Sequence, residues 1–141
     1  MNQVLRHTAA QVEADYFLQT HSTNPLLRPA TISRAIQAFF ASQEHDSLFS
    51  VTRLQTRLYD HSGQPINHDP SVLLRTQDLL PVYEENSNLY IFAKKTILGE
   101  GQRIGRKPLM FEIDKIEAWD IDIEADFIIA EEFFKKSLAV S

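Results

Sequence analysis

The sequence predicts an α/β fold with a mostly parallel sheet. Short apolar runs that suit strands alternate with longer stretches in which apolar residues recur at helical spacing. The chain has 141 residues, 43% of them hydrophobic, so it is large enough to bury one substantial core. Neither an internal repeat nor a low-complexity linker divides it. We therefore expect a single domain over residues 1–141.

The first part of the chain alternates between helix and strand signals. The expected elements are a helix at 5–12, a short buried strand at 16–18, a loop at 20–28, a helix from 29 and a strand at 48–58. Pro29 favours the start of the second helix, because a proline in the first turn forgoes no helical hydrogen bond. The last strand carries Arg53, Gln55 and Arg57 at period two, which predicts one polar, basic face.

The second part of the chain begins with an irregular segment. Residues 59–82 contain three prolines and a glycine among several Asp and Asn residues, which predicts a long excursion, or arm. A loop of that length usually serves function or grips a partner. The remaining elements are expected as a strand at 88–92, a glycine-rich loop at 99–105, short strands at 109–113 and 118–121, and an amphipathic helix from 123.

Composition excludes several classes of function. The net charge is −5 and the pI about 5.5, so the chain has no overall positive field for nucleic acid or an anionic membrane. There is no cysteine, which removes disulfides and thiolate chemistry. No apolar run approaches the roughly 20 residues that span a bilayer, and the start does not resemble a signal peptide. We expect a soluble, cytoplasmic protein.

The most informative motif is Trp119-Asp120-Ile121-Asp122, directly before the last predicted helix. On a strand, Asp120 and Asp122 would face the same side, and a divalent cation such as Mg²⁺ would relieve their repulsion. The motif alone favours a simpler interpretation, in which Asp122 caps the helix. A calcium-loop interpretation fails because Ala125 stands where that loop needs glycine.

Other candidate motifs are weaker. The glycine-rich loop with Arg103, Arg106 and Lys107 matches neither the dinucleotide nor the P-loop spacing, which favours a flexible connector with solvated charges. The five histidines lack the spacing of a catalytic zinc site. His21 alone follows a predicted strand end, where α/β sheets bind ligands.

Three stretches of the sequence match a known family. They are Phe17-Leu18-Gln19-Thr20-His21-Ser22-Thr23-Asn24-Pro25-Leu26, the segment from Arg75 to Tyr90, and Ala118-Trp119-Asp120-Ile121-Asp122 with Glu124 and Phe127. In this order they resemble the acylneuraminate cytidylyltransferases. They are similar to the family's nucleotide and sugar loop, its sugar-facing segment and its Asp-Ile-Asp metal motif. Together the three stretches span most of the chain.

The resemblance implies a nucleotide-diphospho-sugar-transferase-like, Rossmann-like fold with a protruding dimerisation arm. It also implies transfer of a cytidylyl group from CTP to a sialic-acid-type 2-keto sugar acid, by attack of the anomeric hydroxyl on the α-phosphate. It makes Asp120 and Asp122 ligands of Mg²⁺. The substrate-binding residues that it implies are His21, Thr23, Asn24, Arg57, Arg75, Asn86 and Tyr90. Family members form homodimers, so a homodimer is expected.

The sequence also departs from the family pattern. His21 stands where glutamine is commoner, and Ser87-Asn88 replaces the commoner Gly-Ala, which points to a different sugar acid. The family's N-terminal glycine-rich and basic loop for CTP phosphates is not found in these residues. We therefore expect an N-terminally truncated domain that is inactive alone. The alternative is a non-catalytic sugar-acid-binding or dimerisation module, such as a pseudoenzyme or half of a split enzyme.

Overall fold

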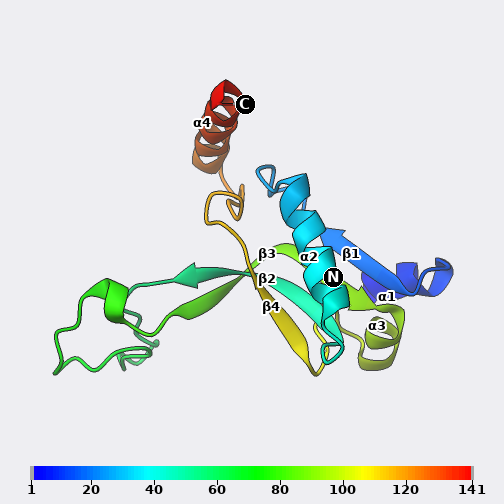
Figure 1. The fold of residues 1–141 in the computed structure, drawn as a ribbon, viewed down its shortest axis with the longest axis horizontal. Coiled ribbons are helices and arrows are strands. Elements are labelled where there is room, and N and C mark those ends of the chain that lie inside the picture. The colour runs from blue at the N-terminus through cyan, green and yellow to red at the C-terminus, as the bar shows by residue number, and fades with distance from the viewer. Residues whose placement is uncertain (1, 141) are drawn as a thin grey trace.

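The computed structural model describes residues 2–140 (Figure 1). Pro29 begins the second helix, as predicted. The elements are α1 (Asn2–Gln11), β1 (Tyr16–Thr20), α2 (Pro29–Ala41), β2 (Ser47–Leu54), a short 3₁₀ helix η1 (Thr76–Asp78), β3 (Val82–Ala93), α3 (Lys94–Glu100), β4 (Pro108–Glu112) and α4 (Glu124–Val140).

The four strands form one sheet in the order β1-β3-β2-β4. The α/β class is confirmed, but the sheet is mixed rather than mostly parallel. β3 runs antiparallel to both β1 and β2, and only β2 and β4 are parallel. The difference arises at the excursion between β2 and β3. There the chain turns back instead of crossing over through a helix, so consecutive strands pair antiparallel.

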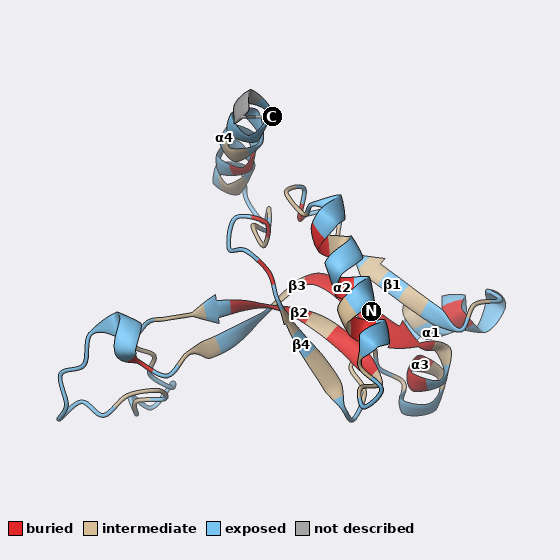
Figure 2. Ribbon diagram, viewed as in Figure 1, coloured by how far each residue is buried: buried red, intermediate tan, exposed pale blue. Residues whose placement is uncertain are grey.

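Helices cover both faces of the sheet, so the domain core has three layers. Alternate residues of β3 point to opposite faces. Leu89 and Ile91 pack with Ala35 and Phe39 of α2 on one face. Tyr90 and Phe92 pack with residues of α1 and α3 on the other face. Figure 2 shows the buried residues concentrated in β2, β3 and the helical faces that cover them.

Two strand predictions need correction. The run 16–18 begins β1, but β1 is an edge strand in which Tyr16 and Leu18 are exposed rather than buried. The predicted strand at 118–121 is not formed, because residues 115–118 make a turn and 119–121 are irregular. In that turn the Asp114 carboxylate accepts the N–H of Ile116 at 2.8 Å, and its carbonyl accepts the N–H of Ala118. Local aspartate turn chemistry therefore outweighs the apolar pattern.

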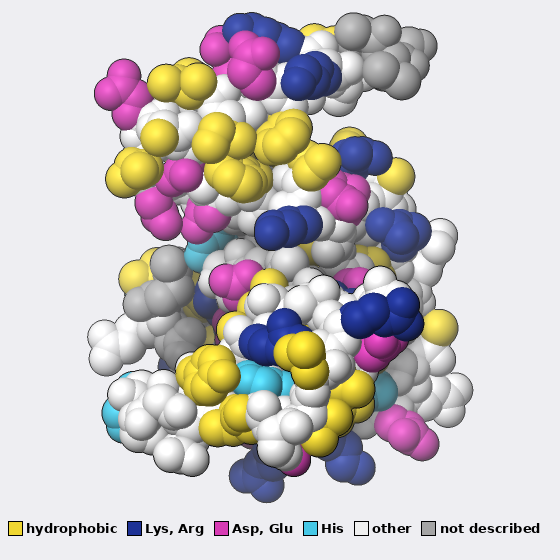
Figure 3. All heavy atoms as spheres, turned by 90° about the vertical axis from the view of Figure 1, so that its left-hand side faces the viewer, with side chains coloured by type: hydrophobic (Ala, Val, Ile, Leu, Met, Phe, Trp, Pro, Cys, Tyr) yellow, Lys and Arg dark blue, Asp and Glu magenta, His cyan; other side chains and the backbone are white. Residues whose placement is uncertain are grey.

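Two segments project from the layered core. The arm comprises residues 55–81 rather than the predicted 59–82, because β2 ends at Leu54 and β3 begins at Val82. It extends sideways between β2 and β3, and α4 stands apart from the sheet (Figure 1). Hydrophobic side chains gather over both segments in the view that faces the arm (Figure 3). Leu73 and Leu80 of the arm are 94% and 76% exposed. Within the described residues, the helices are too short or too polar to cross a membrane.

Candidate functional site

A pocket of about 410 Å³ opens beside the middle of β3, where the segment after β4 passes the β2–β3 pair. Five carboxylate side chains and one lysine contribute to its wall, so the pocket is strongly acidic. A cation, or a ligand with hydrogen-bond donors, therefore suits it. The residues that line it are Thr52, Glu84, Glu85, Asn86, Ser87, Lys115, Ala118, Trp119, Asp120, Asp122 and Asp126.

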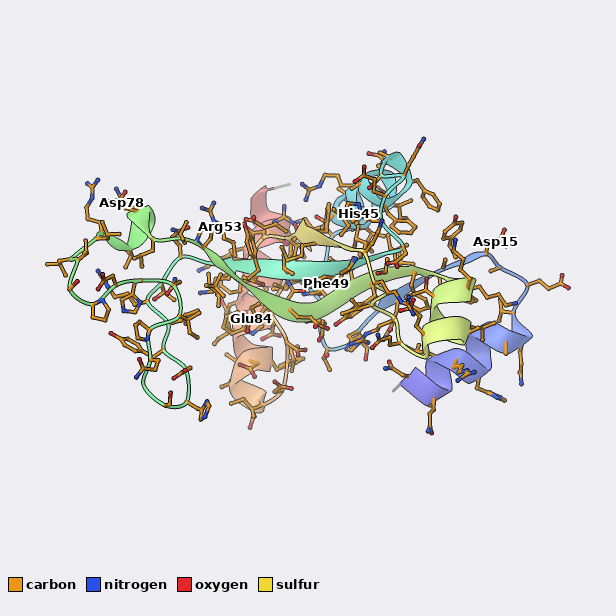
Figure 4. The ribbon with its side chains drawn as sticks, turned by 90° about the horizontal axis from the view of Figure 1, so that it is seen from below. Asp15, His45, Phe49, Arg53, Asp78 and Glu84 are labelled. Carbon is orange, nitrogen blue, oxygen red and sulfur yellow. The ribbon has the colours of Figure 1, made fainter. Side chains whose placement is uncertain are left out.

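The β3 side of the pocket is a bulge. Val51 pairs with Glu85 and Phe49 pairs with Tyr90, so residues 86–89 lie opposite Ser50 alone. Such extra residues bend a strand and redirect its side chains. The register also places Glu84 beside Thr52, and Glu84 and Arg53 project to opposite sides of the β2–β3 ribbon (Figure 4). The bulge thus directs the next residues of β3 toward the pocket.

Asn86 holds this bulge in place. Its Oδ1 accepts hydrogen bonds from Ser50 Oγ at 2.6 Å and from the N–H of Asn88 at 3.2 Å, and its Nδ2 donates to Thr52 Oγ1 at 3.0 Å. Ser50 Oγ also accepts the N–H of Leu89 at 2.8 Å. Asn86 lines the pocket, but most of its hydrogen-bonding capacity maintains the bulge. Its sugar-facing role stays a prediction.

Ser87 adopts a backbone conformation that normally favours glycine. Its φ is +59°, in the left-handed region. Glycine is commoner at this position in the acylneuraminate cytidylyltransferases, which the sequence resembles. The conformation brings the Ser87 side chain to the pocket wall, with its Oγ 3.3 Å from the phenolic oxygen of Tyr90. The departure from the family pattern therefore adds a hydroxyl group to the pocket.

Tyr90 lies behind the pocket wall rather than in its lining. Tyr90 is fully buried, and its hydroxyl donates to Glu85 Oε1 at 2.5 Å. Burial and the hydrogen bond to Glu85 raise the pKa of the Tyr90 phenol above its ordinary value, so the phenol stays protonated at neutral pH. Tyr90 thus supports Glu85 and Ser87, which are the residues that face the pocket.

Arg103 is part of this supporting group, and the prediction of solvated charges in its loop is wrong for this residue. Its guanidinium lies 3.6 Å from the centroid of the Tyr90 ring, and its side chain is only 16% exposed. Nη1 donates to Gln19 Oε1 at 3.2 Å, and Nη2 is 3.9 Å from Glu85 Oε1. A cation over an aromatic face is attracted by the ring quadrupole. No local pattern predicts this contact, because Arg103 lies 13 positions from Tyr90 and 84 positions from Gln19 in the chain.

His21 reaches the same group from the end of β1. Its ring Nε2 is 3.0 Å from Gln19 Nε2, and its ring centroid is 6.4 Å from that of Tyr90. It does not line the pocket. The structure therefore places this predicted substrate-binding residue beside the support of the pocket wall.

The loop that contains Thr23 and Asn24 holds the acidic segment on the opposite wall. The carbonyl of Thr23 accepts the N–H of Ile121 at 2.9 Å, and Asn24 Nδ2 donates to the carbonyl of Trp119 at 3.3 Å. Asn88 Nδ2 donates to the carbonyl of Glu117 at 3.4 Å. Thr23 and Asn24 were predicted to bind substrate. In the structure they position the backbone around Asp120.

Asp120 and Asp122 both line the pocket, although no strand presents them. The helix-capping interpretation of Asp122 is wrong. Asp126, in the first turn of α4, reaches back to accept the N–H groups of Asp122 and Ile123, each at 3.1 Å. In the described part of the chain, the carboxylates of Asp120 and Asp122 accept neither a hydrogen bond nor an ion pair. Both remain available to a cation.

This donor set fits a magnesium ion that shares its coordination with substrate. Among residues 2–140, no group of three or more His, Cys, Asp or Glu side chains is arranged to enclose a metal. Mg²⁺ is commonly held by one or two carboxylates together with water and substrate phosphates rather than by an all-protein cage. Two unpaired carboxylates on one wall therefore match the ion better than they match zinc or calcium.

Arg57 and Arg75 lie in the arm and do not line the pocket of their own chain. The guanidinium of Arg57 donates to the carbonyl of Leu74, and Arg75 pairs with Asp78 at 3.0 Å. Lys115 is the cation in the pocket lining among the described residues, and sequence reasoning missed it. It occupies a turn position with no motif around it, so only the folded chain reveals its place.

Comparison with known proteins gives consistent results. A family model described as cytidylyltransferase matches residues 1–137. N-acylneuraminate cytidylyltransferase A of Danio rerio is 31% identical over 127 residues, covering 85% of this chain and 29% of that protein. Post-translational flagellin modification protein B of Campylobacter coli is 23% identical over 126 residues, covering 86% and 54%. The chain thus spans about a third and about half the length of these relatives.

Solved structures share the fold. The crystal structure of 4-diphosphocytidyl-2C-methyl-D-erythritol synthase from Anaerococcus prevotii has a TM-score of 0.67 at 11% identity, covering 95% of this chain and 66% of that chain. The structure of HddC from Yersinia pseudotuberculosis has a TM-score of 0.51 at 14% identity, covering 95% and 62%. At these identities the similarity establishes the architecture.

Proposed function

Because the chain belongs to the cytidylyltransferase family, we propose that its acidic pocket binds Mg²⁺ and a sialic-acid-type 2-keto sugar acid for cytidylyl transfer from CTP. The sugar class is supported by the resemblance of three sequence segments and by the relative named N-acylneuraminate cytidylyltransferase A. The product of the complete reaction would be a CMP-sugar, with pyrophosphate as the leaving group.

The observation that carries this proposal is the pair of unpaired carboxylates at the pocket. Asp120 and Asp122 would hold Mg²⁺, which when bound would neutralise charge on the phosphate oxygens. The chain's own contribution is to keep these two side chains in place and free of internal partners. Hydrogen bonds from Asn24 and to Thr23 fix the backbone around Asp120, and Asp126 satisfies the helix terminus instead of Asp122.

Charge determines how a sugar acid would lie in the pocket. Its carboxylate is repelled by Glu84 and Glu85 and attracted by Lys115, the lysine of the lining. Its hydroxyl groups are donors, which suit the carboxylate oxygens of the acidic wall as a whole. The pocket thus has an acidic wall for hydroxyl groups and a single basic position for an anionic group.

We also propose that the complete site is shared between two copies of the chain. Arg75 is 76% exposed in its side chain and lies on an arm with exposed apolar residues, away from its own pocket. An arm that packs on a second copy would bring this guanidinium to the partner's site, where it can grip a carboxylate at two points. Homodimer formation would therefore add a guanidinium to the basic residue, Lys115, that the single chain places at its own pocket.

Titration calorimetry of the chain with Mg²⁺ tests the metal site. We expect Asp120→Asn and Asp122→Asn each to weaken Mg²⁺ binding by about tenfold or more, because each removes one of the two anionic ligands. Melting temperatures should hardly change, since the structure gives neither carboxylate an internal partner. Glu124→Gln is the matched control, because it removes a nearby negative charge outside the pocket lining. Equal losses in all three variants, or none in the aspartate variants, would contradict the proposal.

A further inference from the structure

Glu85 combines an anchored oxygen with an available one. Its Oε1 accepts the Tyr90 hydroxyl at 2.5 Å and lies 3.9 Å from Arg103 Nη2. Its Oε2 has no hydrogen bond or ion pair in the described part of the chain. The side chain is 43% exposed and lines the acidic pocket. One half of the carboxylate is therefore fixed to the protein, and the other half is open to a ligand.

Arg103 is itself held from both ends. At its tip the guanidinium stacks on Tyr90 and bonds to Gln19. The loop that follows Arg103 in the chain is held by Asp46, whose carboxylate accepts the N–H of Arg106 at 2.9 Å and the N–H of Lys107 at 3.2 Å. A Cβ at Gly105 would lie 2.4 Å from the same carboxylate, so glycine is required for this approach. The position of the guanidinium is thus built into the fold.

We propose that Glu85 is a specificity-determining residue that accepts a hydrogen bond from a substrate hydroxyl, and that Arg103 is the positioning residue that holds Glu85 through Tyr90. The inference rests on the proposed function, because it takes the ligand to be a polyhydroxylated sugar acid. The inference adds that the β3 wall of the pocket, through Glu85, selects the sugar. A pocket group built to bond a hydroxyl rejects analogues that lack it, since the group would otherwise stay unpaired.

The two partners of Tyr90 act on its phenol in opposite directions. The hydrogen bond and charge of Glu85 raise the pKa of Tyr90, whereas the charge of Arg103 lowers it. Removing Glu85 should therefore move the Tyr90 pKa down, and removing Arg103 should move it further up. A general loosening of the site would expose the phenol in both variants and lower the pKa in both.

Calorimetry and tyrosine NMR on the whole chain test this arrangement, with N-acetylneuraminate as the probe in the presence of Mg²⁺. We expect Glu85→Gln and Arg103→Gln to weaken probe binding by about tenfold and severalfold, while Mg²⁺ affinity is unchanged. Arg103→Lys should recover part of the loss, because it keeps the charge but not the planar stack. Glu112→Gln, an exposed carboxylate on β4 outside the pocket lining, should bind the probe like the wild type.

The Tyr90 titration is followed by labelling tyrosine at Cζ and assigning the signal with Tyr90→Phe. Opposite pKa shifts in Glu85→Gln and Arg103→Gln, together with weaker probe binding, support the inference. Shifts in the same direction overturn it. Wild-type binding with no loss in Glu85→Gln also overturns it, and leaves the proposed function standing. Failure of the wild type to bind N-acetylneuraminate, or any other sialic-acid-type 2-keto sugar acid offered in its place, overturns both.

Discussion

At the scale of single residues, Ser87 shows how the pocket depends on backbone conformation. A non-glycine residue with φ of +59° is disfavoured, and Ser87 is the one non-glycine residue among residues 2–140 that adopts positive φ. The bulge around it is stabilised by side-chain hydrogen bonds of Asn86 and Ser50. These contacts offset the backbone strain at Ser87. The conformation places the Ser87 hydroxyl group 3.3 Å from the Tyr90 oxygen.

Replacing Ser87 separates the backbone cost from the hydroxyl contact. Ser87→Gly should keep the melting temperature or raise it slightly, because relief of about 1 kcal/mol of left-handed strain offsets the lost hydrogen bond. Ser87→Ala should lower it, because alanine keeps the strain and loses the bond. Calorimetric melting of the two variants measures the order. If Ser87→Gly melts at a lower temperature than Ser87→Ala, the strain of the left-handed backbone does not determine stability at this position.

The residues of the site differ in how visible they are from sequence. Asp120, Asp122 and Asn86 could be found because they belong to short motifs that resemble a family, and the structure brings all three to one pocket. Tyr90, Thr23 and Asn24 lie in the same motifs but support the walls. Arg103 and Lys115 could not be found, because their importance comes from contacts that only the folded chain creates.

At the scale of elements, the loop after α3 is more ordered than its glycine content suggests. Asp46 anchors it, and this carboxylate has a pKa below its ordinary value of 3.8. Burial alone would raise the pKa, but hydrogen bonds from the N–H of Lys107, Ser47 Oγ and the N–H of Arg106 outweigh it. A pKa depressed by folding means that the charged carboxylate contributes stability above pH 3.8 and loses that contribution as the pH falls through the folded value.

Asp46→Asn should therefore lower stability at neutral pH by about 1 kcal/mol, a value reduced for solvent screening because the site is only partly buried. It should also flatten the decline in stability that the wild type shows below about pH 4. Melting temperatures between pH 7 and pH 2 measure both effects. Asp15→Asn is the control, because the exposed Asp15 carboxylate makes no hydrogen bond or ion pair within the described residues. A variant with unchanged acid sensitivity would exclude Asp46 as the anchor.

Strand prediction shows where local pattern reaches its limit. The strand predicted at 109–113 lies within one residue of β4, whereas the strand predicted at 88–92 covers only the second half of β3. The run 118–121 has the same apolar character but lies beyond the end of β4, in a segment fixed by the Asp114 turn and by Thr23. The relative direction of neighbouring strands could not be predicted either, because the apolar pattern of a strand does not reveal whether its neighbour runs parallel or antiparallel.

At the scale of the whole molecule, the arm is the feature that a single chain leaves unsatisfied. Leu73 and Leu80 are 94% and 76% exposed, and Val72 and Leu74 are about half exposed. Burial of such side chains stabilises association at roughly 25 cal/mol per Å² before the entropy of association is subtracted. We expect a two-fold homodimer in which the arm packs on the second copy.

Sedimentation velocity at micromolar concentration tests this assembly. The wild type should sediment as a dimer, and Leu73→Asp should shift it toward monomer by weakening association about tenfold or more, because a charge would have to be buried at the interface. Val4→Asp introduces the same charge at an exposed apolar position of α1, which is 67% exposed and far from the arm in sequence, and should leave the mass unchanged. A wild-type monomer that Leu73→Asp does not alter would refute the dimer.

The bulge in β3 has a consequence for how this site can change over time. Glu85 and Tyr90 are five positions apart, an odd spacing that would place them on opposite faces of a regular strand, yet they bond to each other. The bulge resets the phase of the strand between the pocket and the core. Deleting or inserting one residue there would invert that phase and turn Leu89 to Phe92 inside out. Residues of this segment can therefore be substituted over time, but its length cannot change by one residue without reversing which side chains of β3 face each side of the sheet.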